Sequence, residues 1–298
     1  MGFKKFSLAT LTILYLLVLA GGIVRSTGSG MGCPDWPTCF GRIIPPTEES
    51  QLPLNYQEIY KEKLHGEITF NPVKTWIEYL NRLLGALTGL AMLITCILGF
   101  KKDKKTGLYS FMALFFVLAN AVLGKYVVDS FLLPGVVTAH MVLTIAVLFF
   151  LLKAIHHNQE KIILTKQEKS IILINLILVA FQIITGTQVR ENMDHVILEL
   201  GENQKNLWIE NLNFIYIVHR SSTWLLIIAN LLLWFKFKSN KIIKNYLMGV
   251  FTLLGISILT GILMAYFSLP IGTQPIHLTL SLLALGLHLK MLITTQYE

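Results

Sequence analysis

Seven polar side chains interrupt stretches of this 298-residue sequence that are otherwise apolar. A polar or ionisable group in such a stretch costs free energy unless it is paired or has a function, so these side chains are the first candidates for chemistry. Three of them are imidazoles, which can bind a metal or move a proton. The seven are Glu78, Asn81, Arg82, His140, His219, Arg220 and His277.

The three histidines could act as metal ligands. A lone histidine in an apolar helix is more often a hydrogen-bonded core residue, and each of the three taken singly could be one. Together they favour heme, because two imidazoles on neighbouring helices, each about 2 Å from the iron, hold a porphyrin edge-on between apolar helix faces. His219 and His277 would form such a pair. The corresponding earlier positions are Asn81 and His140, which offer a single imidazole.

Glu78 belongs to the part of the chain that offers one imidazole. An iron with two strong axial ligands passes electrons, whereas an iron with one can also take oxygen or water. Glu78, Asn81 and Arg82 are spaced i, i+3 and i+4, so they share one helix face. A carboxylate in a dry pocket of this kind is suited to proton transfer beside an oxidising iron. The alternative is an ion pair of Glu78 with Arg82 that only fixes the helix end.

Four arginines are expected near the outer rim of the bilayer, where a guanidinium can bind a heme propionate in bidentate fashion. An interfacial arginine without a ligand is the alternative for each of them. Among the other histidines, His65 and His195 in outer segments have weaker claims to a role, although His195 could lie over a heme edge. The four arginines are Arg25, Arg82, Arg190 and Arg220.

Lipid is the expected solvent of the elements that position these residues. Hydrophobic residues make up 54% of the chain and charged residues only 14%. The apolar residues fall into eight runs, each near the length of about 20 residues with which a helix crosses a bilayer. We therefore predict an all-α integral membrane protein with eight transmembrane helices. The predicted spans are 7–24, 76–100, 107–124, 132–152, 170–189, 212–235, 246–267 and 276–294.

The net charge of the chain is +8, and the distribution of the charged residues agrees with the predicted topology. With the N-terminus inside, the inner segments hold 15 of the 25 lysines and arginines but only 4 of the 17 acidic residues. This asymmetry is typical of the positive-inside rule, so both termini are predicted to be cytoplasmic and no nucleic-acid partner is needed to explain the basic composition. The candidate site residues then lie toward the outer face.

The chain is predicted to consist of two related halves of four helices. Gly124 precedes His140 by 16 residues, and Gly261 precedes His277 by the same distance. Such a duplication predicts two pseudo-symmetric four-helix bundles. The predicted halves are residues 1–153 and 154–298.

Residues 1–24 have an alternative interpretation as a cleaved secretory signal, because Lys4 and Lys5 precede an apolar run that ends in small residues. The motif Gly22-Ile23-Val24-Arg25 at its end has a partner in Gly186-Thr187-Gln188-Val189-Arg190, at the end of the fifth span. The first span is therefore predicted to be a member of the repeat.

The first outer loop, residues 25–75, is the largest difference between the halves. It is polar and holds Cys33 and Cys39, six residues apart on the oxidising face. A disulfide is favoured over a metal site, for which two thiols without an adjacent histidine are a poor ligand set, and redox cycling is a further option. Cys96 in the second span is predicted to be an ordinary buried thiol.

These motifs resemble those of the heme A synthases over essentially the whole chain. The most specific segment is residues 21–37, with the sequence GGIVRSTGSGMGCPDWP. Further similar segments are Glu78-Tyr79-Leu80-Asn81-Arg82, Leu133-Pro134 with Thr138-Ala139-His140-Met141, Gly186-Thr187-Gln188-Val189-Arg190, and His219-Arg220.

The resemblance implies oxidation of the C8 methyl group of heme O to a formyl by successive hydroxylations, for cytochrome oxidase biogenesis, with heme b as a cofactor in the C-terminal half. It implies catalysis by Glu78, a loop cysteine pair of Cys33 and Cys39, and iron ligation by His140, His219 and His277. Asn81 departs from the family pattern, because it stands where the fourth histidine ligand is expected. The iron of the substrate heme would then keep one axial coordination position open.

The partners implied are heme O, the heme O synthase that supplies it, an electron acceptor of unknown identity and the lipid of a bacterial cell (inner) membrane, with a homo-oligomer as an option. Two rival classes stay open, namely a di-heme b-type electron-transfer protein and a heme-handling assembly factor. Glu78 and Asn81 favour the enzyme, because an electron carrier gains nothing from a carboxylate beside one iron or from the loss of a ligand.

Overall fold

A computed structural model describes residues 2–61, 70–129, 135–267 and 269–297, so His65 and the Leu133-Pro134 pair lie outside the described residues. The described chain is mostly helical, with two short strands and two 3-10 turns. The elements are α1 (Phe3–Ser26), η1 (Glu49–Gln51), α2 (Tyr56–Ile59), α3 (Pro72–Lys102), α4 (Lys104–Asp129), α5 (Val136–His156), β1 (Ile162–Leu164), α6 (Lys166–Leu200), η2 (Glu202–Leu207), α7 (Phe214–Phe237), α8 (Lys241–Tyr266), α9 (Thr273–Ile293) and β2 (Thr295–Tyr297).

Eight helices of the described chain, α1 and α3 to α9, are long and apolar enough to cross a membrane. Each overlaps one predicted span, so the expected all-α fold with eight spans is confirmed. Their outward faces carry exposed large apolar side chains, such as Leu90, Phe115 and Trp224. Water would disfavour that surface, whereas lipid tails solvate it. The protein is therefore a multi-pass membrane protein.

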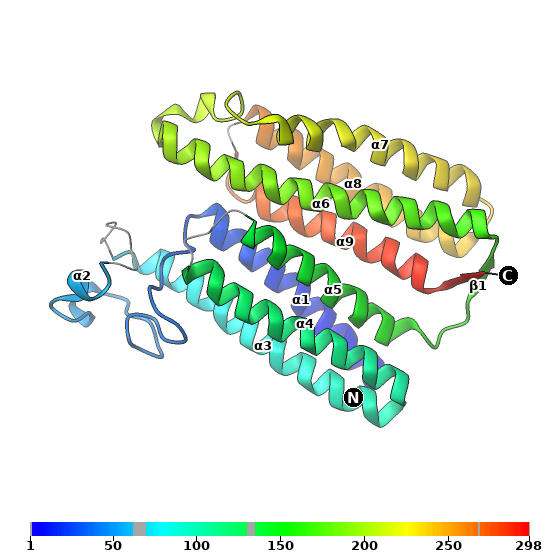
Figure 1. The fold of residues 1–298 in the computed structure, drawn as a ribbon, viewed down its shortest axis with the longest axis horizontal. Coiled ribbons are helices and arrows are strands. Elements are labelled where there is room, and N and C mark those ends of the chain that lie inside the picture. The colour runs from blue at the N-terminus through cyan, green and yellow to red at the C-terminus, as the bar shows by residue number, and fades with distance from the viewer. Residues whose placement is uncertain (1, 62–69, 130–134, 268, 298) are drawn as a thin grey trace.

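The helices form two neighbouring groups of four (Figure 1). Helices α1, α3, α4 and α5 pack together, and α6 to α9 form the second group. Helix α9 joins the groups, because it packs against α1 and α5 as well as against α6 and α8. Both termini lie at one end of the helices, and the loop that contains α2 projects from the opposite end.

The backbone shows the predicted repeat directly. Helices α5 and α9, the last of each group, both begin after a glycine in the left-handed region, Gly135 with φ of 85° and Gly272 with φ of 84°. Such a conformation favours glycine, which has no Cβ to clash with the backbone. The two glycines precede His140 and His277 by the same number of residues, five. The boundary predicted between residues 153 and 154 falls near the end of α5 and stays a prediction.

Helix α6 differs most from its predicted range. The predicted span ends at residue 189, but the helix continues to Leu200. It begins with a capping box, in which Thr165 and Glu168 bond each other's backbone N–H groups. Its extension carries Glu191 and Asp194, whose charges suggested a loop. Both are engaged by other elements, so the helix projects past the apolar span.

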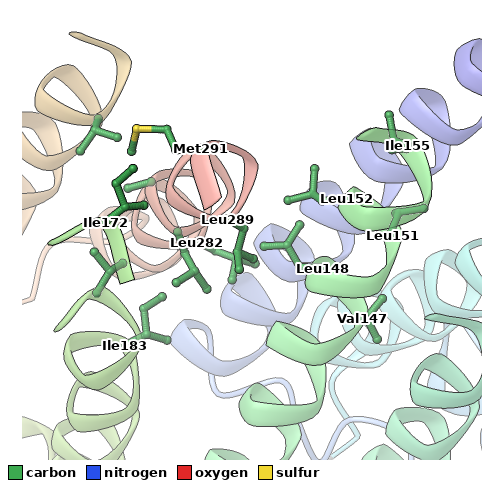
Figure 2. Packing of buried hydrophobic residues seen from close by; sticks show 14 of the residues in the cluster. Val147, Leu148, Leu151, Leu152, Ile155, Ile172, Ile183, Leu282, Leu289 and Met291 are labelled. Carbon is green, nitrogen blue, oxygen red and sulfur yellow. The ribbon is translucent and has the colours of Figure 1, made fainter. Parts of the chain in front are cut away.

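The apolar core runs across both groups of helices. Figure 2 shows Leu148 and Leu152 of α5 pointing toward α9, which carries Leu282 and Leu289. On the other side of α9, Ile172 and Ile183 of α6 belong to the same cluster. The two four-helix groups therefore share one continuous core with α9 at its centre.

Candidate functional site

The two imidazoles of the second half, predicted to form a ligand pair, lie close together. His219 projects from α7 and His277 from α9, and their ring centroids are 6.3 Å apart. An imidazole nitrogen lies about 2 Å from a transition metal, and the ring centroid lies about 1 Å further, so rings on opposite sides of one ion have centroids about 6 Å apart. The observed spacing fits the predicted pair of axial ligands.

Hydrogen bonds fix which nitrogen of each ring is free to bind a metal. The Nδ1–H of His277 donates to the Ser257 carbonyl oxygen at 2.7 Å and lies 3.1 Å from the Thr260 hydroxyl. The Nδ1 of His219 lies 3.1 Å from the hydroxyl of Thr185. A ring that uses Nδ1–H as a donor keeps the lone pair of Nε2 for a metal, and such partners orient the ligand and raise its basicity.

Each of the four related positions faces a glycine on another helix. A Cβ added to Gly186 would lie 3.0 Å from the His219 ring, and a Cβ at Gly261 would lie 3.4 Å from the His277 ring. The first half repeats this arrangement, with Gly124 beside His140 at 3.4 Å and Gly21 beside the Asn81 amide at 3.9 Å. Glycine therefore makes room for a side chain at each of the four related positions. Asn81 occupies the fourth of these positions, beside Gly21.

The first half contains buried polar atoms without partners. Within the described residues, neither the Nδ1 of His140 nor the Oδ1 of Asn81 has a hydrogen-bond partner. Such groups are costly unless a ligand satisfies them. His140 thus lacks the fixing bond that His219 and His277 have. Asn81 and His140 lie on α3 and α5, and the structure shows no hydrogen bond between them.

Glu78 lies under the outer loop, as part of a network with Arg82. The carboxylate is only 3% exposed and accepts the backbone N–H of Cys33 at 2.9 Å and the Nη2 of Arg82 at 2.5 Å. Arg82 also donates to the carbonyl oxygens of Cys33, Asp35 and Thr38. The ion pair considered from the sequence is present. A buried carboxylate held by two donors is also placed to exchange a proton, so the two roles are compatible.

The described part of the outer loop covers Glu78. Cys33 and Cys39 form the predicted disulfide, with their Cα atoms 4.9 Å apart. The disulfide packs in a small cluster with Phe40, Tyr56 and Tyr60. Burial, and then the nearby Asp35 carboxylate, raise the pKa of the Tyr60 hydroxyl. Cys96 is free and buried, as predicted.

The four arginines differ in what they bind. Arg25 and Arg190 both pair with Asp194, which lies one turn beyond Arg190 on α6. Arg82 is held by Glu78 and the loop. Arg220 on α7 is exposed and forms no ion pair within the described residues. Arg220 is thus the arginine with a free guanidinium near His219.

Two acidic residues of the site were missed from the sequence. Glu191 is buried and accepts the backbone N–H of Gly135 and Thr138, at 3.1 and 3.2 Å, so it caps helix α5 from the other half. Asp194 bridges the two related arginines Arg25 and Arg190. The spacing of Asp194 four residues after Arg190 was a signal, but the predicted span ended before both.

The donor set fits a metal that a macrocycle already surrounds. No group of three or more histidine, cysteine or acidic side chains close enough to hold a bare ion occurs in the described part of the chain. Two opposed imidazoles with free Nε2 atoms supply only axial ligands, and a porphyrin would supply the rest.

Parts of the chain are similar in sequence to known heme A synthases. It is 31% identical to the heme A synthase of Shewanella oneidensis over 134 residues, which are 44% of this chain and 38% of that protein. It is 31% identical to the heme A synthase of Ehrlichia ruminantium (strain Gardel) over 183 residues, 55% of this chain and 53% of the relative. A third, from Bartonella bacilliformis, is 38% identical over 104 residues, 32% of this chain and 29% of the relative.

The chain spans about half or less of the length of these curated relatives. The match to a protein-family model covers much more of the chain than these pairwise matches do. A family described as cytochrome oxidase assembly protein matches residues 4–289, which include every candidate site residue. The protein therefore belongs to the COX15-CtaA family of cytochrome oxidase assembly proteins.

Proposed function

We propose that the protein is a heme A synthase, an oxidoreductase that converts the C8 methyl group of heme O into a formyl by successive hydroxylations for cytochrome oxidase biogenesis. One observation carries the proposal: the second half offers two imidazoles at the spacing of an axial pair, His219 and His277, whereas the first half offers one imidazole, His140, and the buried carboxylate of Glu78. The relatives named heme A synthases agree with it.

In the second half, His219 and His277 would hold a resident heme b, which when bound supplies one-electron chemistry. Thr185 and the Ser257 carbonyl hold the two rings in place through Nδ1. The rings then need no reorganisation to present Nε2, which favours a permanent cofactor over an exchangeable one.

In the first half, His140 would ligate the substrate heme O from one side. Asn81 offers an amide where the related position has an imidazole, so it leaves the opposite side accessible and can hydrogen-bond a polar group there. The unpartnered Nδ1 of His140 makes this ligation weaker than that in the second half. Weaker ligation suits a substrate that must enter and leave.

A hydroxylation that takes its oxygen from water replaces a C–H bond of the substrate by a C–O bond and releases two electrons and two protons, and Glu78 would accept one of these protons. Arg82 and the Cys33 N–H stabilise its ionised form and hold its position under the loop. The electrons of each hydroxylation pass to an acceptor outside this chain.

Arginines would bind the heme propionates. Arg220 is free for this role within the described residues, while Arg25 and Arg190 would exchange Asp194 for a propionate or share it. Arg82 contributes through Glu78 and the loop, and the Asn81 amide lies beside Gly21.

We also propose a membrane orientation and protein partners for the reaction. The lysine-rich end with both termini would face the cytoplasm of a bacterial cell, and the site would face the outer side of its inner membrane. Heme O would come from a heme O synthase, which gives the chain a protein partner in addition to lipid. Self-association into a homo-oligomer is compatible with the exposed apolar helix faces.

The hemes extracted from cells with and without this gene, in the presence of heme O, test the proposal. A heme A synthase gives heme A only in the presence of the gene. A di-heme b-type electron carrier leaves heme O unchanged and adds heme b, whereas an assembly factor changes the location of heme O without oxidising it. Either of these results would overturn the proposed activity.

A further inference from the structure

A cavity of about 410 Å³ lies at the end of the molecule where both termini lie, opposite to the loop that covers Glu78. Its walls come from α1, α5, α8 and α9, so it lies at the junction of the two four-helix groups. None of the residues assigned above to heme or substrate lines it. The cavity therefore calls for a separate explanation.

The mouth of the cavity is cationic. Lys4 at the start of α1 and Lys290 near the end of α9 line it, together with His156 and Gln159. No described lining residue is acidic, and neither lysine forms an ion pair with a described residue. The Nζ of Lys290 lies 5.0 Å from the Tyr246 ring centroid, a contact that leaves its charge uncompensated. The mouth thus suits an anion.

The inner walls are apolar and come from both halves. Leucines line the cavity from each of its four helices, and apart from the buried Leu152 their side chains are only partly covered by protein. An aqueous anion would leave that surface in contact with water, whereas a hydrocarbon chain would cover it. The leucines are Leu8, Leu11, Leu152, Leu253, Leu283 and Leu287.

One hydroxyl lies between the cationic mouth and the apolar wall. The Oη of Tyr15 lies against Gly286, where an added Cβ would clash with it. Gly286 precedes Lys290 by one helical turn, so the hydroxyl lies about 6 Å from the level of Lys290 along the helix axis. A polar donor one turn below a cation matches the ester groups of a lipid whose phosphate binds the cation.

We propose that this cavity binds an anionic phospholipid of the leaflet that faces the two termini. Lys4 and Lys290 contact its phosphate, the Tyr15 hydroxyl donates to an ester carbonyl, and an acyl chain lies along Leu253, Leu283 and Leu287. Basic pockets between transmembrane helices bind anionic headgroups in this way. The lipid would fill the junction between α1 and α9 and so stabilise the contact between the halves.

Lipid retention by the purified full-length protein tests the site. Native mass spectrometry in detergent, with phosphatidylglycerol or phosphatidylcholine of the same chains added, should show one phosphatidylglycerol that phosphatidylcholine does not replace. Inorganic phosphate alone should not displace it. The double variant Lys4→Gln/Lys290→Gln should bind roughly twenty-five-fold more weakly, because each lysine near an anionic headgroup contributes roughly fivefold. Tyr15→Phe should weaken retention to a lesser extent.

The matched control is Lys5→Gln/Lys101→Gln, which removes the same charge from the same end of the protein but outside the cavity. It should retain phosphatidylglycerol like the unmodified protein. Equal retention of the two phospholipids, displacement by phosphate, equal weakening in the control, or a co-purified neutral quinone in place of the phospholipid would each overturn the proposal. None of these readouts depends on heme, so the outcome is independent of the proposed enzymatic activity.

Discussion

The backbone N–H of Cys33 donates a hydrogen bond to the carboxylate of Glu78 across 2.9 Å. This contact joins the disulfide of the outer loop to the carboxylate proposed to take part in proton transfer. Arg82 closes the network, because it binds Glu78 and the carbonyl oxygen of Cys33 with the same nitrogen. The loop therefore covers the Glu78 carboxylate and fixes its position.

Glu78→Gln should slow heme A formation by at least about a hundredfold, the usual loss when a general base is removed. The amide keeps the shape and can still accept the Cys33 N–H, so heme b should stay bound. Extracted pigments should contain heme O or a hydroxylated intermediate. The exposed Glu58→Gln serves as the control. A normal yield of heme A from Glu78→Gln would show that the carboxylate is structural only.

His219→Ala or His277→Ala should abolish the low-spin spectrum of the second-half heme, because each removes one axial imidazole. Within the described residues, no other histidine lies in ring contact with the pair. The reduced absorption spectrum of the purified variants provides the measurement. The control is His157→Ala. His157 is the C-cap residue of α5 and is not one of the proposed ligands, so this variant should retain the spectrum. Unchanged spectra in both site variants would refute the assignment of the ligands.

Gly186→Ala should lower the heme content even though alanine favours a helix by about 1 kcal/mol over glycine. The new Cβ would lie 3.0 Å from the His219 ring and push the ring away from its bond with Thr185. Gly255→Ala is the matched control, since nothing lies within 4 Å of its added Cβ. Heme-to-protein ratios after purification compare the two, and equal ratios would contradict the proposed fit of the ring against α6.

Asn81→His should make the first-half iron low-spin and slow turnover. The imidazole would occupy the position that corresponds to His219, and Gly21 leaves room for it beside α1. Electron paramagnetic resonance of protein loaded with heme O would detect the change of spin state. A first-half iron that is low-spin before the substitution would show that some other group already serves as its second ligand.

Thiol labelling under denaturing conditions should find one free thiol, Cys96, until a reductant releases Cys33 and Cys39. Mass spectrometry of the labelled peptides identifies the sites. Three labelled cysteines in protein matured in an oxidising compartment would contradict the disulfide. Cys96→Ser should leave no label before reduction, which assigns the single label of the unmodified protein to Cys96.

The spans and the histidine pair were predictable because each depends on a periodic or repeated signal. Eight apolar runs give eight helices, and the equal Gly124–His140 and Gly261–His277 spacings reflect contacts that the structure shows in both halves. The disulfide was predictable from the short separation of Cys33 and Cys39. These features depend on residue type and separation alone.

The partners that fix the site were not predictable in this way. Thr185 and Ser257 contact the histidine rings through one hydroxyl and one backbone carbonyl, and neither residue type is unusual in an apolar helix. Glu191 and Asp194 carry charges that suggest solvent, so the sequence alone placed them outside the helix. Gly135, Thr138 and Arg25, which bind these two side chains, come from distant parts of the chain, and only the tertiary structure reveals these contacts.

The cap that Glu191 places on α5 has a consequence for biosynthesis. The N–H groups of Gly135 and Thr138 find their acceptor only on α6, the next transmembrane helix to leave the ribosome. Helix α5, which carries His140, is therefore translated before the acceptor of these two N–H groups exists. The N-terminus of α5, next to His140, therefore acquires these two hydrogen bonds only after the fifth span has been translated.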